Sequence, residues 1–166
     1  MKHLLLLAAL TSPALAAPTI EHFGDWTVET DTSNNIVIAF SFPIDSSARL
    51  FEFSCDNSHL NCRMADINAG KCYTSGNFYS YFRLHSVADR PQDLDFKSTF
   101  VLNCVNHRWV DYQQFDLKYL QQMFHYTWFP ILSIKYGTAG QVTNYSTNGA
   151  AAAADKVMGT FNNFSE

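Results

Sequence analysis

The chain has 166 residues, of which 47% are hydrophobic, 16% charged and 15% aromatic, and its net charge is −4 at pH 7. A composition so rich in aromatics and so poor in charge excludes an intrinsically disordered chain, and the length suits one domain. A mildly acidic chain without a basic run is also a poor binder of nucleic acid or anionic lipid through charge.

The first residues have the three parts of a secretory signal. A short polar start precedes the apolar run Leu4–Leu10, and Ala14 and Ala16 supply the small residues that signal peptidase requires. The apolar run is too short to span a bilayer, which takes about 20 residues. We therefore expect cleavage after Ala16. Residues 17–166 should then form one exported domain, periplasmic or extracellular, without stable membrane insertion.

Period-two alternation of apolar and polar residues predicts several strands. They are Asp25–Glu29, Ile36–Phe42, Leu50–Cys55, Phe78–Leu84, Phe100–Val105 and Ile131–Tyr136. In the second of them, Ile36, Ile38, Phe40 and Phe42 share one face. Clusters of Asn, Asp, Gly, Ser and Pro between these runs predict turns.

The cysteines indicate a disulfide framework. Cys55, Cys62, Cys72 and Cys104 form an even set in an exported chain, which predicts two disulfides. The loop-forming residues between Cys55 and Cys62 would place these two opposite each other across a hairpin, and Cys72 would then pair with Cys104. The nested alternative pairs Cys62 with Cys72 and Cys55 with Cys104. Zinc on Cys55, His59 and Cys62 would lack a fourth ligand, so we expect no metal and no cofactor.

Two stretches have helical spacing instead. Apolar residues recur at steps of three and four in Asp111–Phe124, with Asp111 as the N-cap. The second helix, Ala150–Phe161, starts with five consecutive alanines, and Asn148 is a possible cap. The sequence therefore predicts a mainly β (α+β) fold: an antiparallel, β-sandwich-like domain with two packed helices, one of them near the C-terminus.

No catalytic signature stands out. The sequence has no GxSxG, HExxH or CxxC motif and no glycine-rich phosphate loop. His107 followed by Asp111 could place a base near a carboxylate, but such a pair is more often a solvated strand end. The acidic loop Asp89–Asp95 is more typical of a solvated turn than of a calcium site. We therefore assign no catalytic residue.

Aromatic residues are densest between Trp109 and Phe129. Most of them are expected to pack between a helix and the sheet. A surplus would suit a protein interface, where Trp and Tyr bury much area with little loss of entropy. The candidate interface residues are Trp109 and Trp128, together with Asp89 and Asp93 of the acidic loop.

Short motifs near both ends of the mature chain carry a family resemblance. Phe23–Val28 reads Phe-Gly-Asp-Trp-Thr-Val, Leu50–Cys55 reads Leu-Phe-Glu-Phe-Ser-Cys, and a Gly-Ala helix begins within Asn148–Ala153. In this order they resemble the small exported bacterial proteins of the invasion-associated locus B family and certain periplasmic proteins associated with type VI secretion. The usual cysteine after the first strand is missing, because Glu29–Asp31 stands there, and the middle of the chain does not match.

The resemblance implies a β-sandwich-like periplasmic domain without known catalytic residues, linked to envelope interactions or virulence. We therefore expect a non-enzymatic, soluble, periplasmic or secreted protein that binds another envelope or secreted protein. One alternative is a periplasmic inhibitor or immunity protein that blocks a cell-wall hydrolase or a secreted toxin through the Asp89–Asp95 loop. The other alternative is a small hydrolase.

Overall fold

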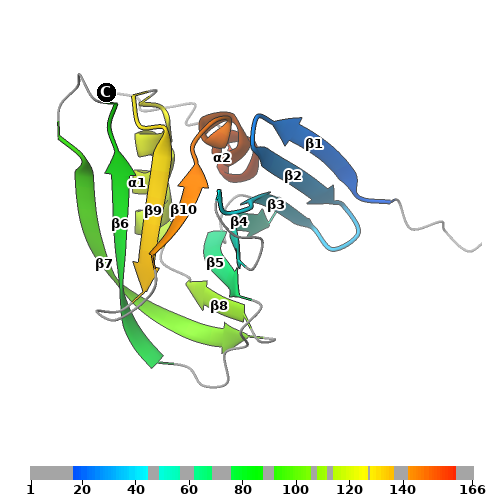
Figure 1. Cartoon of the computed structure of the whole chain (residues 1–166). Helices are drawn as coiled ribbons and strands as arrows, with labels where there is room; N and C mark the ends of the chain where they lie inside the picture. Colours follow the sequence, from blue (N-terminus) through cyan, green and yellow to red (C-terminus); the bar gives the residue numbers. More distant parts are fainter. Residues whose placement is uncertain are drawn as a thin grey trace, which may run out of the picture.

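The computed structural model describes residues 17–44, 49–56, 62–68, 76–87, 92–105, 108–111, 114–126, 128–136 and 142–159. These ranges hold ten strands and two helices (Figure 1). The strands are β1 (Thr19–Phe23), β2 (Trp26–Asp31), β3 (Ile36–Ser41), β4 (Arg49–Asp56), β5 (Cys62–Asn68), β6 (Gly76–His85), β7 (Leu94–Val105), β8 (Arg108–Asp111), β9 (Ile131–Tyr136) and β10 (Val142–Ser146). The helices are α1 (Gln114–Phe124) and α2 (Ala150–Met158).

Every pair of neighbouring strands is antiparallel, in the order β1-β2-β3-β4-β5-β8-β7-β6-β9-β10. The first sheet contains β1 to β5, the second contains β7, β6, β9 and β10, and the short β8 connects them. β7 passes from one sheet to the other, since its residues 94–102 pair with β6 and its residues 103–105 pair with β8. Such a strand makes a corner between two sheets. The predicted mainly β, sandwich-like architecture with two helices is therefore confirmed.

Trp26 lies at the centre of the core and has no exposed surface. Its ring stacks on Phe53, with centroids 5.6 Å apart, and contacts Phe51 and Phe124 at 6.2 and 5.7 Å. Phe51 in turn lies 5.5 Å from the ring of Tyr145. Because these rings come from β2, β4, α1 and β10, a single hydrophobic core connects both sheets with the helices.

α2 packs closely because its buried face consists of small side chains. Ala150, Ala153, Ala154 and Val157 recur at helical spacing and have no exposed surface. The helix contacts α1 and strands β1 to β4. In Figure 1 it lies between β10 and the β1–β2 hairpin. The alanines are therefore contact residues as well as good helix formers.

α1 begins later than its spacing predicts. The expected N-cap, Asp111, is instead the last residue of β8, where it pairs with Met64 of β5. The helix starts at Gln114. Pairing with β5 holds residues 109–111 extended, and tertiary pairing of this kind overrides a local helical pattern.

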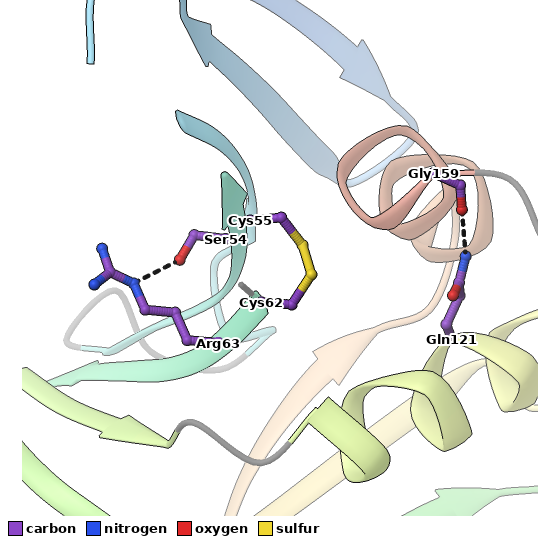
Figure 2. The surroundings of a disulfide bond; sticks show 6 residues. All are labelled: Ser54, Cys55, Cys62, Arg63, Gln121 and Gly159. Carbon is purple, nitrogen blue, oxygen red and sulfur yellow. Dashed lines mark hydrogen bonds between the residues drawn. A yellow bond between two sulfur atoms is a disulfide. The ribbon is translucent and has the colours of Figure 1, made fainter. Parts of the chain in front are cut away.

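A buried polar contact joins the two helices. Gln121 of α1 has no exposed surface, and its Nε2 donates to Asp155 Oδ1 at 2.7 Å. The same nitrogen donates to the Gly159 carbonyl at 3.4 Å (Figure 2). His125 Nε2 lies 3.0 Å from the same Asp155 oxygen. These bonds fix the C-terminal end of α2 against α1.

α2 also differs from its prediction at both ends. It stops at Met158, short of the expected Phe161, and Gly159 follows it with φ 77°. Its N-cap is Gly149, at φ 84°, and not Asn148. Asn148 instead takes part in a contact with the β1–β2 turn.

Two turns far apart in the sequence meet through two glycines. Gly24 in the β1–β2 turn and Gly149 before α2 have φ 55° and 84°. A Cβ on Gly149 would lie 1.9 Å from the Phe23 carbonyl oxygen, and one on Gly24 would lie 2.7 Å from the Asn148 carbonyl oxygen. The Asp25 N–H donates to that Asn148 carbonyl at 3.0 Å. Both the positive φ and the close approach require glycine.

Polar side chains reinforce this contact between the Gly24 turn and the Gly149 turn, which we call the glycine joint. Trp26 Nε1 donates to the Ser146 carbonyl at 2.9 Å, and Ser146 Oγ donates to Asp25 Oδ2 at 2.6 Å. The sequence motifs at 23–28 and 148–153 therefore contact each other in the fold, although more than a hundred residues separate them.

The first predicted disulfide is confirmed. Cys55 of β4 and Cys62 of β5 lie directly opposite each other, with a bond between their sulfurs and 4.1 Å between their Cα atoms (Figure 2). This bond excludes the nested pairing and the zinc site, because both need the free thiols. Cys72 and the side chain of Cys104 lie outside the described part of the chain, so their pairing stays a prediction.

Gly149→Ala should strongly destabilise the fold. The new Cβ would collide with backbone at a positive φ, and the left-handed region alone costs an L-residue about 1–2 kcal/mol. With the displacement of the β1–β2 turn, we expect a loss of about 3 kcal/mol or more in the free energy of unfolding. Chemical denaturation of residues 17–166 measures it.

The matched control is Ala152→Ser, which adds one atom at an exposed position of α2. It should change stability by less than about 0.5 kcal/mol. Equal stability of the Gly149→Ala variant and the wild type would contradict the glycine joint.

Candidate functional site

The outer face of the second sheet carries a groove of about 1000 Å³. Its size is at the upper end of the range for small-ligand pockets. The groove is lined by Tyr81, Phe82, Arg83, His85, Asp95, Ile131, Ser133, Lys135, Val142 and Asn144. The alternate residues Leu84, Leu132 and Ile134 are buried in the core, so strand alternation turns the polar set outward.

One row of the groove is polar across all four strands. Asp95, Arg83, Ser133 and Asn144 lie opposite one another in register, from β7 to β10. Arg83 donates to Asp95 through Nε at 2.5 Å and through a terminal nitrogen at 2.7 Å. This two-point pair lowers the pKa of the Asp95 carboxyl, chiefly by hydrogen bonding, and raises the pKa of Arg83.

A chain of polar contacts joins this row to the side chains at the end of the groove. Asp93 Oδ2 lies 3.3 Å from His85 Nδ1, His85 Nε2 lies 2.7 Å from Ser133 Oγ, and Ser133 Oγ donates to Asn144 Oδ1 at 2.5 Å. Ser133 is only 6% exposed. The order carboxylate, imidazole, hydroxyl is that of a nucleophilic triad, which is recognised by geometry and not by sequence position.

The hydroxyl proton, however, is directed away from the imidazole. An oxygen–oxygen distance of 2.5 Å fits an O–H···O bond and is too short for N–H···O, so Ser133 donates to Asn144. With the hydroxyl proton given to Asn144, the 2.7 Å contact of His85 Nε2 with Ser133 Oγ is not that of a base accepting the serine proton. Ser133 also lies in a central strand paired on both sides, where the backbone N–H groups belong to ladders and offer no oxyanion hole.

A second row across the groove has the cation of Lys135 at its centre, with a less polar side chain on each side. Lys135 of β9 lies opposite Tyr81 of β6 on one side and opposite Val142 of β10 on the other. Within the described ranges Lys135 makes no ion pair. Its ammonium group is therefore available to a ligand in the groove.

Exposed apolar side chains border the groove along β10. Pro43 bridges to Tyr145, and the Ile44 N–H donates to the Asn144 carbonyl at 2.9 Å, so the chain after β3 lies beside β10. Pro43 is buried, whereas Phe42 and Ile44 are 59% and 58% exposed. Val142 is 48% exposed. We call Phe42, Ile44 and Val142 the apolar rim.

The candidate interface residues are not brought together by the described structure. Asp93 is held at the end of the groove by the Ser86 N–H (3.0 Å) and by His85. Trp128 is half-buried against the core, and its ring lies 4.9 Å from that of the exposed Tyr126. Asp89 and the side chain of Trp109 lie outside the described residues.

Sequence reasoning missed the groove and the rim. The alternation in residues 131–136 does indicate that Ser133 and Lys135 face away from the core. It does not indicate which strands lie next to each other, so it cannot predict a groove built from four strands. The shared face of Ile36, Ile38 and Phe40 also proves to be the less buried one, because Val37 and Ala39 enter the core.

Comparisons with known proteins add no assignment: no protein-family model, characterised protein or solved structure matches this chain. No helix among the described residues is long and apolar enough to cross a membrane. Nor does any group of three or more His, Cys, Asp and Glu side chains there have the arrangement of a metal site.

The Arg83–Asp95 pair predicts a pH effect. The folded-state pKa of Asp95 is lowered, so the pair stabilises the fold above the unfolded pKa of about 3.9 and this contribution is lost as pH falls through the folded value. Both side chains are half-exposed, so the contribution should be small. An NMR titration of the Asp95 carboxyl should give a midpoint below the ordinary one.

Arg83→Gln should raise that midpoint towards the ordinary aspartate value. The control Arg63→Gln removes an arginine that bonds to Ser54 on the other sheet (Figure 2) and should leave Asp95 unchanged. An Asp95 midpoint that does not respond to Arg83→Gln would contradict the pair.

Proposed function

We propose that this chain is an exported, non-enzymatic protein that binds another protein through the groove and its apolar rim. The observation that carries the proposal is the juxtaposition of fixed polar side chains with Phe42, Ile44 and Val142, each about half exposed or more. Exposed apolar side chains near ordered polar groups are typical of protein interfaces. An aromatic residue such as Phe42 is also enriched there.

Export is part of the proposal. It is supported by the signal-like segment 1–16 and by the Cys55–Cys62 disulfide, since disulfides persist in oxidising compartments. A periplasmic or secreted location and a role in envelope interaction, secretion or virulence are what the family resemblance adds. The partner is then an envelope or secreted protein, and a cell-wall hydrolase or toxin is one member of that class.

A small hydrolase is the second candidate function, and the order Asp93, His85, Ser133 is the observation that favours it. Two features favour binding instead: the Ser133 proton is given to Asn144, and the central strand supplies no oxyanion donors. A fluorophosphonate probe distinguishes the two, because it labels an activated serine. We expect no adduct on Ser133. An adduct that disappears in His85→Ala, with the fold intact, would establish the hydrolase.

Val142→Asp should weaken recognition without unfolding the chain, because Val142 lines the groove and is already half exposed. A displayed random-peptide library selected on residues 17–166 supplies the binding probes. We expect the selected peptides to bind Val142→Asp at least tenfold more weakly, since the charge lies within the apolar rim. Affinity is measured by titration calorimetry or fluorescence.

Ile20→Asp is the control, because Ile20 is 62% exposed on β1 of the first sheet. It should bind the selected peptides as the wild type does. Peptides that are indifferent to Val142→Asp, or no selected peptide at all, would overturn the groove as the recognition surface.

A further inference from the structure

We infer that the groove accepts an acidic side chain of the partner, with an apolar neighbour of that side chain packed on the rim. This inference rests on the proposed function and adds the chemistry of the bound segment. It rests on two observations among the described residues: hydrogen-bond donors of the groove that have no acceptor within it, and a cation of the groove that has no counter-ion.

Each acceptor oxygen of Asp95 and Asn144 already receives a hydrogen bond within the groove. The Asp95 carboxylate receives two bonds from Arg83, and Asn144 Oδ1 receives the Ser133 proton. Donors are left over: the second terminal nitrogen of Arg83, the amide nitrogen of Asn144 and the ammonium of Lys135. A groove with spare donors is complementary to an acceptor, and a carboxylate is the strongest acceptor a protein partner presents.

The charged side chains of the groove also favour an acidic ligand. Its charged side chains are Arg83, which is paired with Asp95, and Lys135, while Asp93 lies at the end of the groove against His85. Lys135 is thus the charged group of the groove that no ion pair among the described residues neutralises. An unpaired cation favours an acidic group over a basic one as its neighbour in a complex.

The position of Lys135 ties the charge to the apolar rim. Val142 lies directly opposite Lys135, and Ile44 follows beyond Asn144 on the same side of the sheet. A carboxylate bound to Lys135 would therefore place the residues on one side of it against Val142 and Ile44. The segment expected is an Asp or Glu next to one or two large apolar residues.

The test uses the peptides selected on residues 17–166. We expect their shared motif to contain Asp or Glu beside an apolar residue. Lys135→Met, which keeps the apolar stem and removes the charge, should weaken these peptides at least tenfold. Lys135→Glu should weaken them further, and replacing the peptide acid by Lys should restore binding to Lys135→Glu. Thermal melts of each variant check the fold.

The control is Lys118→Glu, which makes the same charge change at an exposed position of α1 and should alter affinity less than twofold. Peptides that need Val142 but lack an acid or ignore Lys135 would overturn this inference and leave the proposed function in place. Peptides that ignore both Val142 and Lys135 would overturn both. Peptides with a basic motif would also overturn the acidic segment.

Discussion

The close approach of the turns at Gly24 and Gly149 is the constraint on which the rest of the structure depends. It presses the start of α2 against the β1–β2 hairpin, and the alanine face of the helix then meets strands β1 to β4. The same contact brings the end of β10 to Trp26 through the Ser146 carbonyl. One joint between backbone groups therefore sets the position of a helix and ties the last strand of the second sheet to the first sheet.

The groove follows from this arrangement. Because the inner faces of both sheets meet the helices in one core, alternation leaves the other face of the second sheet outside. The bridge between Pro43 and Tyr145 then places the chain after β3 beside β10, which brings Phe42 and Ile44 to the edge of the polar row. Phe42 and Ile44 lie about a hundred residues before Val142 and Asn144 in the sequence, and only the closure of the two sheets brings them to one surface.

In the polar row, the direction of each hydrogen bond distinguishes a binding site from a catalytic one. Distances alone would rank Asp93, His85 and Ser133 as a nucleophilic triad. The 2.5 Å contact from Ser133 to Asn144 assigns the single hydroxyl proton elsewhere, and the neighbouring ladders use the backbone N–H groups that an oxyanion would need. Lys135 and one terminal nitrogen of Arg83 keep hydrogen-bond donors that the groove does not use, as expected of a recognition site.

The sequence by itself determined the local features: alternating strands, the Cys55–Cys62 hairpin and the existence of two helices, because each depends on neighbours within about ten residues. It misplaced the start of α1 at Asp111, since pairing of β8 with β5 decides that residue's conformation. The motifs around Gly24 and Gly149 are visible in the sequence, but nothing in the sequence indicates that they contact each other. Which strands lie side by side, which face of each is buried, and hence the groove around Ser133, were decided only by tertiary structure, because register and closure depend on contacts between distant segments.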